Sequence, residues 1–133
     1  MDFVELDLQI TKDDVLITNH DPCLKETTNV EDYNFMFGDR LFNGTFYPSG
    51  NTYTDDYLIR DFTLDELQIL KRKQRYTDRN FYLNNVFGIL TAEQAINMLL
   101  ELNAQFPKDK LVGLYIETKE YQYYLDNYNI NIA

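Results

Sequence analysis

The chain opens with the stretch that decides its fold, Phe3-Val4-Glu5-Leu6-Asp7-Leu8-Gln9-Ile10-Thr11-Lys12-Asp13-Asp14-Val15-Leu16-Ile17. Apolar and polar residues alternate through its first half, which is the period of a β-strand, so we expect a strand over Phe3–Gln9. A turn at residues 12–14 then leads into a second short strand at residues 15–17. Glu5 and Asp7 share the polar face of the first strand, about 6–7 Å apart along it. Such a carboxylate pair can bind one hard cation through its oxygens.

The sole histidine of the chain follows the second strand. His20 precedes Asp21 and Pro22, so an imidazole stands a few residues beyond the carboxylate pair. A cluster of ionisable groups at strand ends is a candidate active site. A Glu-x-Asp pair is more often a solvated strand face, and a lone histidine is more often structural. The residue pattern alone therefore leaves both interpretations open.

The composition and charge of the chain limit the classes of protein to which it can belong. The chain has 133 residues, of which 44% are hydrophobic and 15% aromatic, as expected for one globular domain with a modest core. A net charge of −10 argues against nucleic-acid binding. An anionic substrate would need a local positive charge, which a bound cation would supply. Cys23 is the sole cysteine, so an intramolecular disulfide is excluded. No apolar run approaches the roughly 18 residues of a membrane span.

The segment from Val30 to Asp61 is rich in aromatic residues and shows no helical period. We expect a long loop that packs either on itself or over a site, and the two interpretations stay equal. Asn43-Gly44-Thr45 fits a glycosylation sequon, but Asn-Gly more often forms a tight turn, which is the interpretation we prefer.

Two helices follow. Thr63 and Glu66 form a capping box, which begins a helix expected over residues 63–75. This helix would end in a cluster of cations (Lys71, Arg72, Lys73 and Arg75), where they complement its dipole; a phosphate or lipid-headgroup patch is the alternative. Thr91 begins a second helix, expected over residues 92–106 and stopped by Pro107.

A second major strand is expected over Leu111–Glu117. Glu117 and Lys119 share one face at its carboxyl end, in the manner of Glu5 and Asp7, although an exposed strand end would look the same. Helical spacing resumes at Tyr121. The order strand–helix–strand predicts an α/β fold in which the two major strands are parallel neighbours and both helices pack outside them.

Five motifs together resemble the glycerophosphodiester phosphodiesterase family. They are Val4-Glu5-Leu6-Asp7, Thr11-Lys12-Asp13, His20-Asp21-Pro22, Thr27-Thr28-Asn29 and Gly113-Leu114-Tyr115-Ile116-Glu117-Thr118-Lys119. The resemblance implies a (β/α)8 TIM barrel of roughly 250 residues. This chain would be a partial barrel, from the second strand through the next signature strand and its helix, with an aromatic-rich insertion at about 30–61. The His-Arg-Gly and Pro-Glu-Asn-Thr motifs of the family's first strand are absent. We therefore expect a fragment that is inactive by itself.

The resemblance also implies roles for individual residues. Glu5, Asp7 and Glu117 would bind Mg²⁺ or Ca²⁺, His20 would act in acid–base catalysis, and Lys119 would contact the phosphate. The substrate would be a small glycerophosphodiester, hydrolysed to an alcohol and sn-glycerol 3-phosphate. The family's second catalytic histidine has no counterpart here. A related phospholipid phosphodiesterase and a non-catalytic binding or interaction module remain as alternatives.

Overall fold

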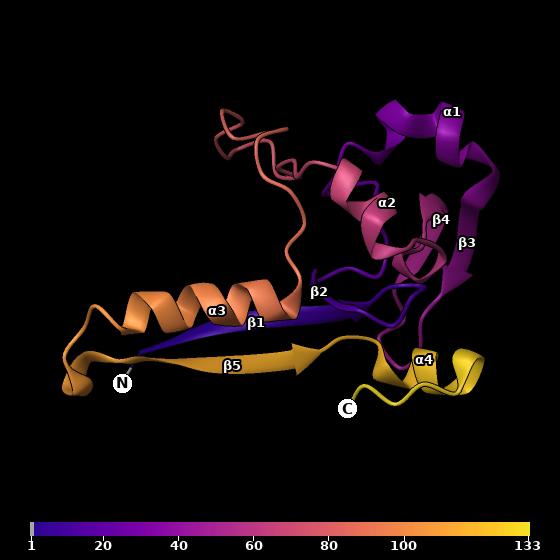
Figure 1. Ribbon diagram of the computed structural model, residues 1–133. Coiled ribbons are helices and arrows are strands. Elements are labelled where there is room, and N and C mark those ends of the chain that lie inside the picture. Colours follow the sequence, from indigo (N-terminus) through magenta and orange to yellow (C-terminus); the bar gives the residue numbers. More distant parts are fainter. Residues whose placement is uncertain (1) are drawn as a thin grey trace.

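A three-stranded sheet forms the base of the molecule. The computed structural model describes residues 2–133 and places β1 (Asp2–Ile10) between β2 (Leu16–Thr18) and β5 (Val112–Thr118). β2 is antiparallel to β1, while β5 is parallel to it with Asp7 opposite Glu117 (Figure 1). The predicted strands and the parallel pairing are thus confirmed. The polar ends of β1 and β5 come to lie side by side.

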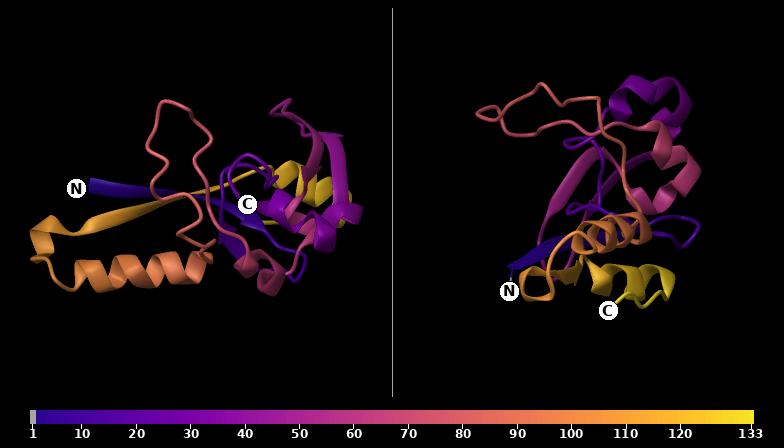
Figure 2. Two further views of the ribbon diagram at one scale, coloured as in Figure 1. Left: turned by 90° about the horizontal axis from the view of Figure 1, so that it is seen from above. Right: turned by 60° about the vertical axis from the view of Figure 1, so that its left-hand side comes forward.

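Two helices flank β5 in the sequence. α3 (Ala92–Asn103) runs alongside β1 and β5, and α4 (Tyr121–Tyr128) follows β5 directly (Figures 1 and 2). The predicted capping box of Thr91 and Gln94 begins α3, but the helix ends at Asn103 rather than at residue 106. The Asn103 side chain explains this end, because its amide donates to and accepts from the backbone of Val112 at 2.8 and 2.9 Å. α3 is thereby fixed to the start of β5.

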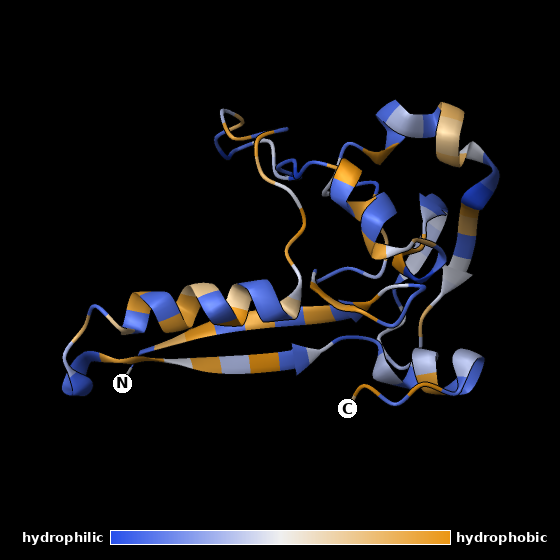
Figure 3. Ribbon diagram, viewed as in Figure 1, coloured by the Kyte–Doolittle hydropathy of each residue, from blue (hydrophilic) through white to orange (hydrophobic). Residues whose placement is uncertain are grey.

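The apolar side of α3 is only partly covered by the described part of the chain. Figure 3 shows apolar bands along this helix, and Met98, Leu100 and Leu102 are exposed. Ala92 is its one buried residue. α3 therefore gains little of its stability from burial in the residues described here.

The prediction of a long loop over residues 30–61 is wrong in that the segment contains short helices and strands, although it does pack on itself, as one of the two interpretations expected. The segment forms η1 (Val30–Tyr33), α1 (Asn34–Phe37), η2 (Gly38–Arg40), a hairpin of β3 (Leu41–Thr45) and β4 (Thr52–Tyr57), and η3 (Ile59–Asp61). Each element is too short to show a period. The packing of aromatic rings stabilises them instead, as with Phe46 and Tyr53, whose ring centroids lie 5.6 Å apart.

The predicted turn at Asn43-Gly44 is also wrong, because both residues lie within β3. The register of the hairpin shifts between Phe42 and Gly44, and a Cβ at Gly44 would lie 2.5 Å from the Phe42 ring. This glycine therefore serves a close approach inside a bulged strand. The actual turn lies between Thr45 and Thr52.

α2 (Leu64–Ile69) is shorter than predicted. Its capping box of Thr63 and Glu66 is present, but the backbone becomes extended at Leu70, whose side chain is buried. The chain then continues as an extended segment in which Arg72 pairs with Thr28, and the Asn29 side chain accepts from the backbone amide of Lys71 at 2.7 Å. The basic residues 71–75 are therefore not helix-terminal cations, and their interpretation as partners of a helix dipole is wrong.

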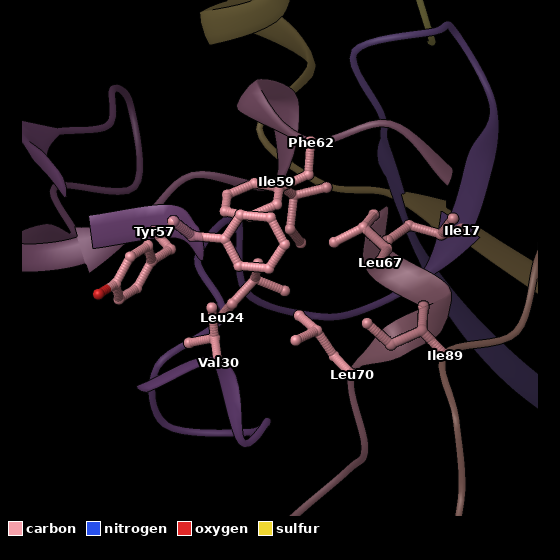
Figure 4. Packing of buried hydrophobic residues seen from close by; sticks show 10 residues of the cluster. Ile17, Leu24, Val30, Tyr57, Ile59, Phe62, Leu67, Leu70 and Ile89 are labelled. Atoms are coloured by element: carbon pink, nitrogen blue, oxygen red, sulfur yellow. The ribbon is translucent and has the colours of Figure 1, made fainter. Parts of the chain in front are cut away.

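The main hydrophobic core lies beside the sheet rather than over it. Residues 30–61, called the middle segment below, contribute to it together with β2, α2 and the single residues Leu24, Phe62, Leu70 and Ile89 (Figure 4). Phe37 and Phe62 meet edge to face at 5.0 Å, and Arg40 lies over both rings. Arg40 also forms a bidentate pair with Glu66 at 2.8 Å, which joins the middle segment to α2. No helix among residues 2–133 is both long enough and apolar enough to cross a membrane.

Candidate active site

Three carboxylates converge at the β1–β5 pair, where Glu5 lies midway along β1 and Asp7 faces Glu117 near the carboxyl end of the parallel pairing. Glu5, Asp7 and Glu117 each offer an oxygen, and these atoms lie within 4.8 Å of one another. The strand period puts Glu5 and Asp7 on one face of β1, and the parallel register puts Glu117 opposite Asp7. The sequence motifs thus predicted which side chains come together.

This donor set fits a hard divalent cation. Oxygens bound to one Mg²⁺ or Ca²⁺ each lie about 2.0–2.6 Å from it, so two of them can be at most about 4–5 Å apart. The three carboxylates meet this limit. Asp7 Oδ1 is also buried and makes no hydrogen bond among the described residues, so its ion pair with Lys119 Nζ at 3.3 Å is the contact that offsets its burial.

Lys119 lies at the rim of the carboxylate cluster. Its ammonium group is 2.7 Å from Glu117 Oε1 and 3.3 Å from Asp7 Oδ1. Burial disfavours the charged form of Lys119, but its contacts with Glu117 and Asp7 outweigh this effect and raise its pKa above the ordinary value. Lys119 thus remains a cation beside the carboxylates, within reach of an anion held there.

His20 is oriented by a carboxylate and an arginine. Its Nδ1 lies 2.7 Å from Asp21 Oδ1, and Arg75 contacts Asp21 Oδ2 at 2.8 Å. An ionised carboxylate only accepts, so Nδ1 donates the proton and Nε2 is left to exchange a proton with a substrate. The His20 side chain is 58% exposed, whereas that of Asp21 is 9% exposed. The imidazole is therefore accessible while the carboxylate that orients it is not.

Buried polar residues fix the backbone at His20. The side-chain amide of Gln9, next on the polar face after Asp7, donates to the His20 carbonyl at 2.9 Å. The Tyr124 hydroxyl of α4 donates to the Gln9 amide oxygen at 2.5 Å. Both side chains are fully buried. This chain of hydrogen bonds joins β1, the His20 loop and α4.

Three adjoining cavities meet at His20. A cavity of about 280 Å³ brings His20 together with Glu5 and Asp7, and one of about 420 Å³ brings it together with Glu117 and Lys119. The third, of about 850 Å³, opens between His20, β4 and residues 73–75. Every residue predicted for the site thus borders a cavity that His20 also borders.

The Thr-Lys-Asp motif has a structural explanation. The Thr11 hydroxyl accepts from the Val15 amide at 2.9 Å and donates to Asp13 Oδ1 at 2.6 Å. Asp13 in turn accepts from the Leu64 amide at 3.0 Å, at the start of α2. The hydrogen bond from Thr11, above all, lowers the pKa of Asp13. The motif therefore closes the β1–β2 turn and ties it to α2.

Sequence reasoning missed several residues that border these cavities. Tyr53 borders the two larger ones, and it belongs to the segment whose structure was not foreseen. Arg72 and Arg75 border the smallest one, but they were assigned to a helix end. The alternative of a phosphate patch among these cations was the signal that pointed toward them.

Comparison with known proteins agrees with the geometry of this site. The sequence matches the glycerophosphoryl diester phosphodiesterase family over residues 1–131. The chain belongs to this family. Glycerophosphodiester phosphodiesterase GDPD6 of Arabidopsis thaliana is 38% identical to it over 118 residues, which cover 89% of this chain and 29% of the relative. The chain thus spans less than a third of that relative's length.

A solved structure gives a weaker likeness. It is a glycerophosphoryl diester phosphodiesterase from Parabacteroides distasonis, with a TM-score of 0.49 and 23% sequence identity, covering 92% of this chain and 31% of the other. Membership of the glycerophosphoryl diester phosphodiesterase family accordingly rests on the sequence match.

Proposed function

We propose that this chain supplies the cation site and one acid–base residue for metal-dependent hydrolysis of glycerophosphodiesters to an alcohol and sn-glycerol 3-phosphate. Glu5, Asp7 and Glu117 would bind the divalent cation. The observation that carries the proposal is the convergence of their oxygens within 4.8 Å, beside cavities that His20 borders. Membership of a family whose relatives are named phosphodiesterases supports the same chemistry.

The fold supports a partial (β/α)8 barrel as the setting of this site. β1 and β5 are parallel neighbours, α3 precedes β5, and Asp7 and Glu117 lie near the carboxyl end of the parallel pairing. Reactive side chains occupy that end of the strands in barrel enzymes. In this proposal residues 30–61 are an insertion beside the site, where Tyr53 borders two of the cavities.

Each polar side chain has a task in this proposal. A divalent cation would hold the phosphodiester and neutralise the charge that develops on its oxygens. Lys119 would donate to a phosphate oxygen from the rim. His20 would exchange a proton through Nε2 with the attacking water or the leaving alcohol, while Asp21 holds its ring. Gln9 would keep the His20 backbone in place.

One observation favours a second candidate function. The sequence contains a single histidine, whereas the resemblance implies an acid–base pair of two. A chain that binds a cation and a phosphodiester without cleaving it would need only the carboxylates and Lys119. A non-catalytic binding module is therefore the alternative.

Cation binding can be tested with Mn²⁺ and NMR. Because His20 is the sole histidine, its ring Hε1 proton gives a single signal that needs no further assignment. We expect Mn²⁺ at low stoichiometry to broaden this signal, and we expect Glu5→Gln to prevent it. Glu101→Gln, an exposed glutamate of α3, removes the same charge and should leave the broadening unchanged. Equal broadening in all three proteins would remove the metal assignment.

Hydrolysis itself can be tested in a chimera. Residues 1–131 would replace the matching part of the Arabidopsis relative, and glycerophosphocholine hydrolysis would be measured with Mg²⁺ or Ca²⁺. We expect turnover that His20→Ala and Glu5→Gln each abolish. A folded chimera that binds the cation without turnover would favour the binding module.

A further inference from the structure

An arginine without an acidic partner borders the smallest cavity. The Arg72 guanidinium donates to the Thr18 carbonyl and to the Asn19 side-chain oxygen, which are both neutral. Among residues 2–133, no carboxylate lies within ion-pair distance of it. Arg75, in the same cavity, differs because it pairs with Asp21 at 2.8 Å.

The backbone around Arg72 is held from both sides. Its amide donates to the Phe87 carbonyl at 2.7 Å, and its carbonyl accepts from Asn85 at 2.8 Å. On the other side Lys73 donates to the Thr27 carbonyl at 2.9 Å. The side chain is therefore delivered to the cavity by a fixed backbone. Burial lowers the pKa of Arg72 below its usual value, yet an arginine stays charged at neutral pH.

A hydroxyl without a hydrogen-bond partner borders the same cavity. Thr27 Oγ1 is buried and makes no hydrogen bond among the described residues. The other residues of the Thr-Thr-Asn motif have structural partners: the Thr28 hydroxyl donates to the Leu24 carbonyl at 2.8 Å, and Asn29 accepts from Lys71. Thr27 is therefore the member of the motif whose side chain is left for a ligand.

We propose that Arg72 and the Thr27 hydroxyl bind phosphate oxygens in this cavity, opposite Glu5 and Asp7. Within the described part of the chain, Arg72 has neutral partners but no carboxylate, the Thr27 hydroxyl has no partner, and a phosphate offers anionic oxygens that accept from both. The proposal rests on the proposed function in one respect. A cation on Glu5 and Asp7 would neutralise them and leave the cavity with the net positive charge that an anion needs.

Cation and phosphate should therefore bind cooperatively. Each would raise the affinity for the other by the same factor, because the coupling between two binding sites is reciprocal. Without a cation, Glu5 and Asp7 repel phosphate, so binding should be weak.

The test measures binding of inorganic phosphate to the 133-residue chain by calorimetry, with and without Mg²⁺. With Mg²⁺ we expect Arg72→Gln to weaken binding at least about 10-fold, since a hydrogen bond to a charged group is worth about that. Lys71→Gln removes the same charge from the adjacent residue, which borders none of these cavities, and should change affinity less than about 2-fold.

Thr27→Val is a second variant that tests the phosphate site even if Arg72→Gln fails to fold. The replacement keeps the shape of the side chain, and the lost hydroxyl has no partner in the protein, so thermal stability should not fall. We expect phosphate affinity to fall about 5-fold or more. Glycerophosphocholine, used as a soluble diester in place of inorganic phosphate, should show the same ranking of variants if the site takes phosphodiesters. If the variants differ in affinity for inorganic phosphate but not for glycerophosphocholine, the site binds free phosphate and not phosphodiesters.

The outcomes separate this proposal from the proposed function. If Arg72→Gln and Thr27→Val bind phosphate as Lys71→Gln does, while Mn²⁺ still broadens the His20 signal, the phosphate site is overturned and the cation site stands. If phosphate binding depends on Arg72 and Thr27 but Mn²⁺ fails to bind, the phosphate site stands and the cation assignment falls.

Discussion

Replacing Glu66 with glutamine tests the link between the middle segment and α2. Glu66 accepts both hydrogen bonds of the Arg40 fork at 2.8 Å and one from the Thr63 amide at 2.9 Å. These contacts, led by the hydrogen bonds from Arg40, lower the pKa of Glu66 from 4.5 to about 2. Glutamine keeps the shape, and its one amide oxygen can still accept from Thr63 and from one arm of Arg40. The substitution therefore removes the charge and the hydrogen bond to the other arm of Arg40.

The magnitude follows from that shift. Each pKa unit corresponds to 1.36 kcal/mol of stability, so the shift sets an upper limit of about 3 kcal/mol. The Glu66 and Arg40 side chains are 28% and 29% exposed, and solvent screening at such sites reduces the value. We expect Glu66→Gln to cost about 1–2 kcal/mol of unfolding free energy at pH 7.

The pH dependence gives a sharper criterion. Because the pKa of Glu66 is lower in the folded state, its ionised form stabilises the fold fully above pH 4.5. This stabilisation is lost as the pH falls from 4.5 through about 2. The stability of wild type and Glu66→Gln should therefore converge on acidification.

The assay is urea unfolding followed by circular dichroism from pH 3 to 7. Asp65→Asn is the matched control, since it removes a charge from the same helical turn without touching Arg40, and it should cost at most about 0.5 kcal/mol. A cost below about 0.5 kcal/mol for Glu66→Gln at pH 7, or a cost that does not change with pH, would refute the reasoning.

Two further predictions concern the site. Tyr124→Phe leaves the buried Gln9 amide oxygen without its donor, so we expect the free energy of unfolding in urea to fall by about 1–2 kcal/mol and the His20 ring signal in NMR to shift. Tyr121→Phe, at an exposed tyrosine of the same helix, is the control. Equal effects of the two substitutions would contradict the role of Gln9. The 133-residue chain alone should not hydrolyse glycerophosphocholine with Mg²⁺ or Ca²⁺, because it has one histidine where a pair is needed. Turnover that His20→Ala abolishes would show that a single histidine suffices.

The elements that could be predicted from the sequence are those with a long alternation of apolar and polar residues or with a helix capping box. Strict alternation located β1, and the order strand–helix–strand predicted its parallel pairing with β5. Both capping boxes began helices where expected. The carboxylate cluster could be foreseen because a parallel register brings matching strand ends together.

Features that depend on tertiary contacts could not be foreseen. Elements of three to six residues in the middle segment carry too few periods to be recognised, and packed rings stabilise them. The end of α2 is set by burial of Leu70 and by the Asn29 hydrogen bond to Lys71, both of which involve partners distant in sequence. For the same reason the orientation of Arg72 toward Thr18 and Asn19 was not visible in the sequence.

The parallel pairing of β1 with β5 has a consequence for the order of folding. β1 leaves the ribosome before its partner β5, which follows more than a hundred residues later, with Asp2 pairing with Val112 and Leu8 with Thr118. Among the described residues, β1 can until then pair only with the three residues of β2, and the unpaired backbone edge that β5 will cover can aggregate. The core between Ile17 and Ile89 closes shorter loops and should form sooner. The cation site, which needs Glu117 beside Asp7, would then assemble only after this core has formed and β5 has paired with β1.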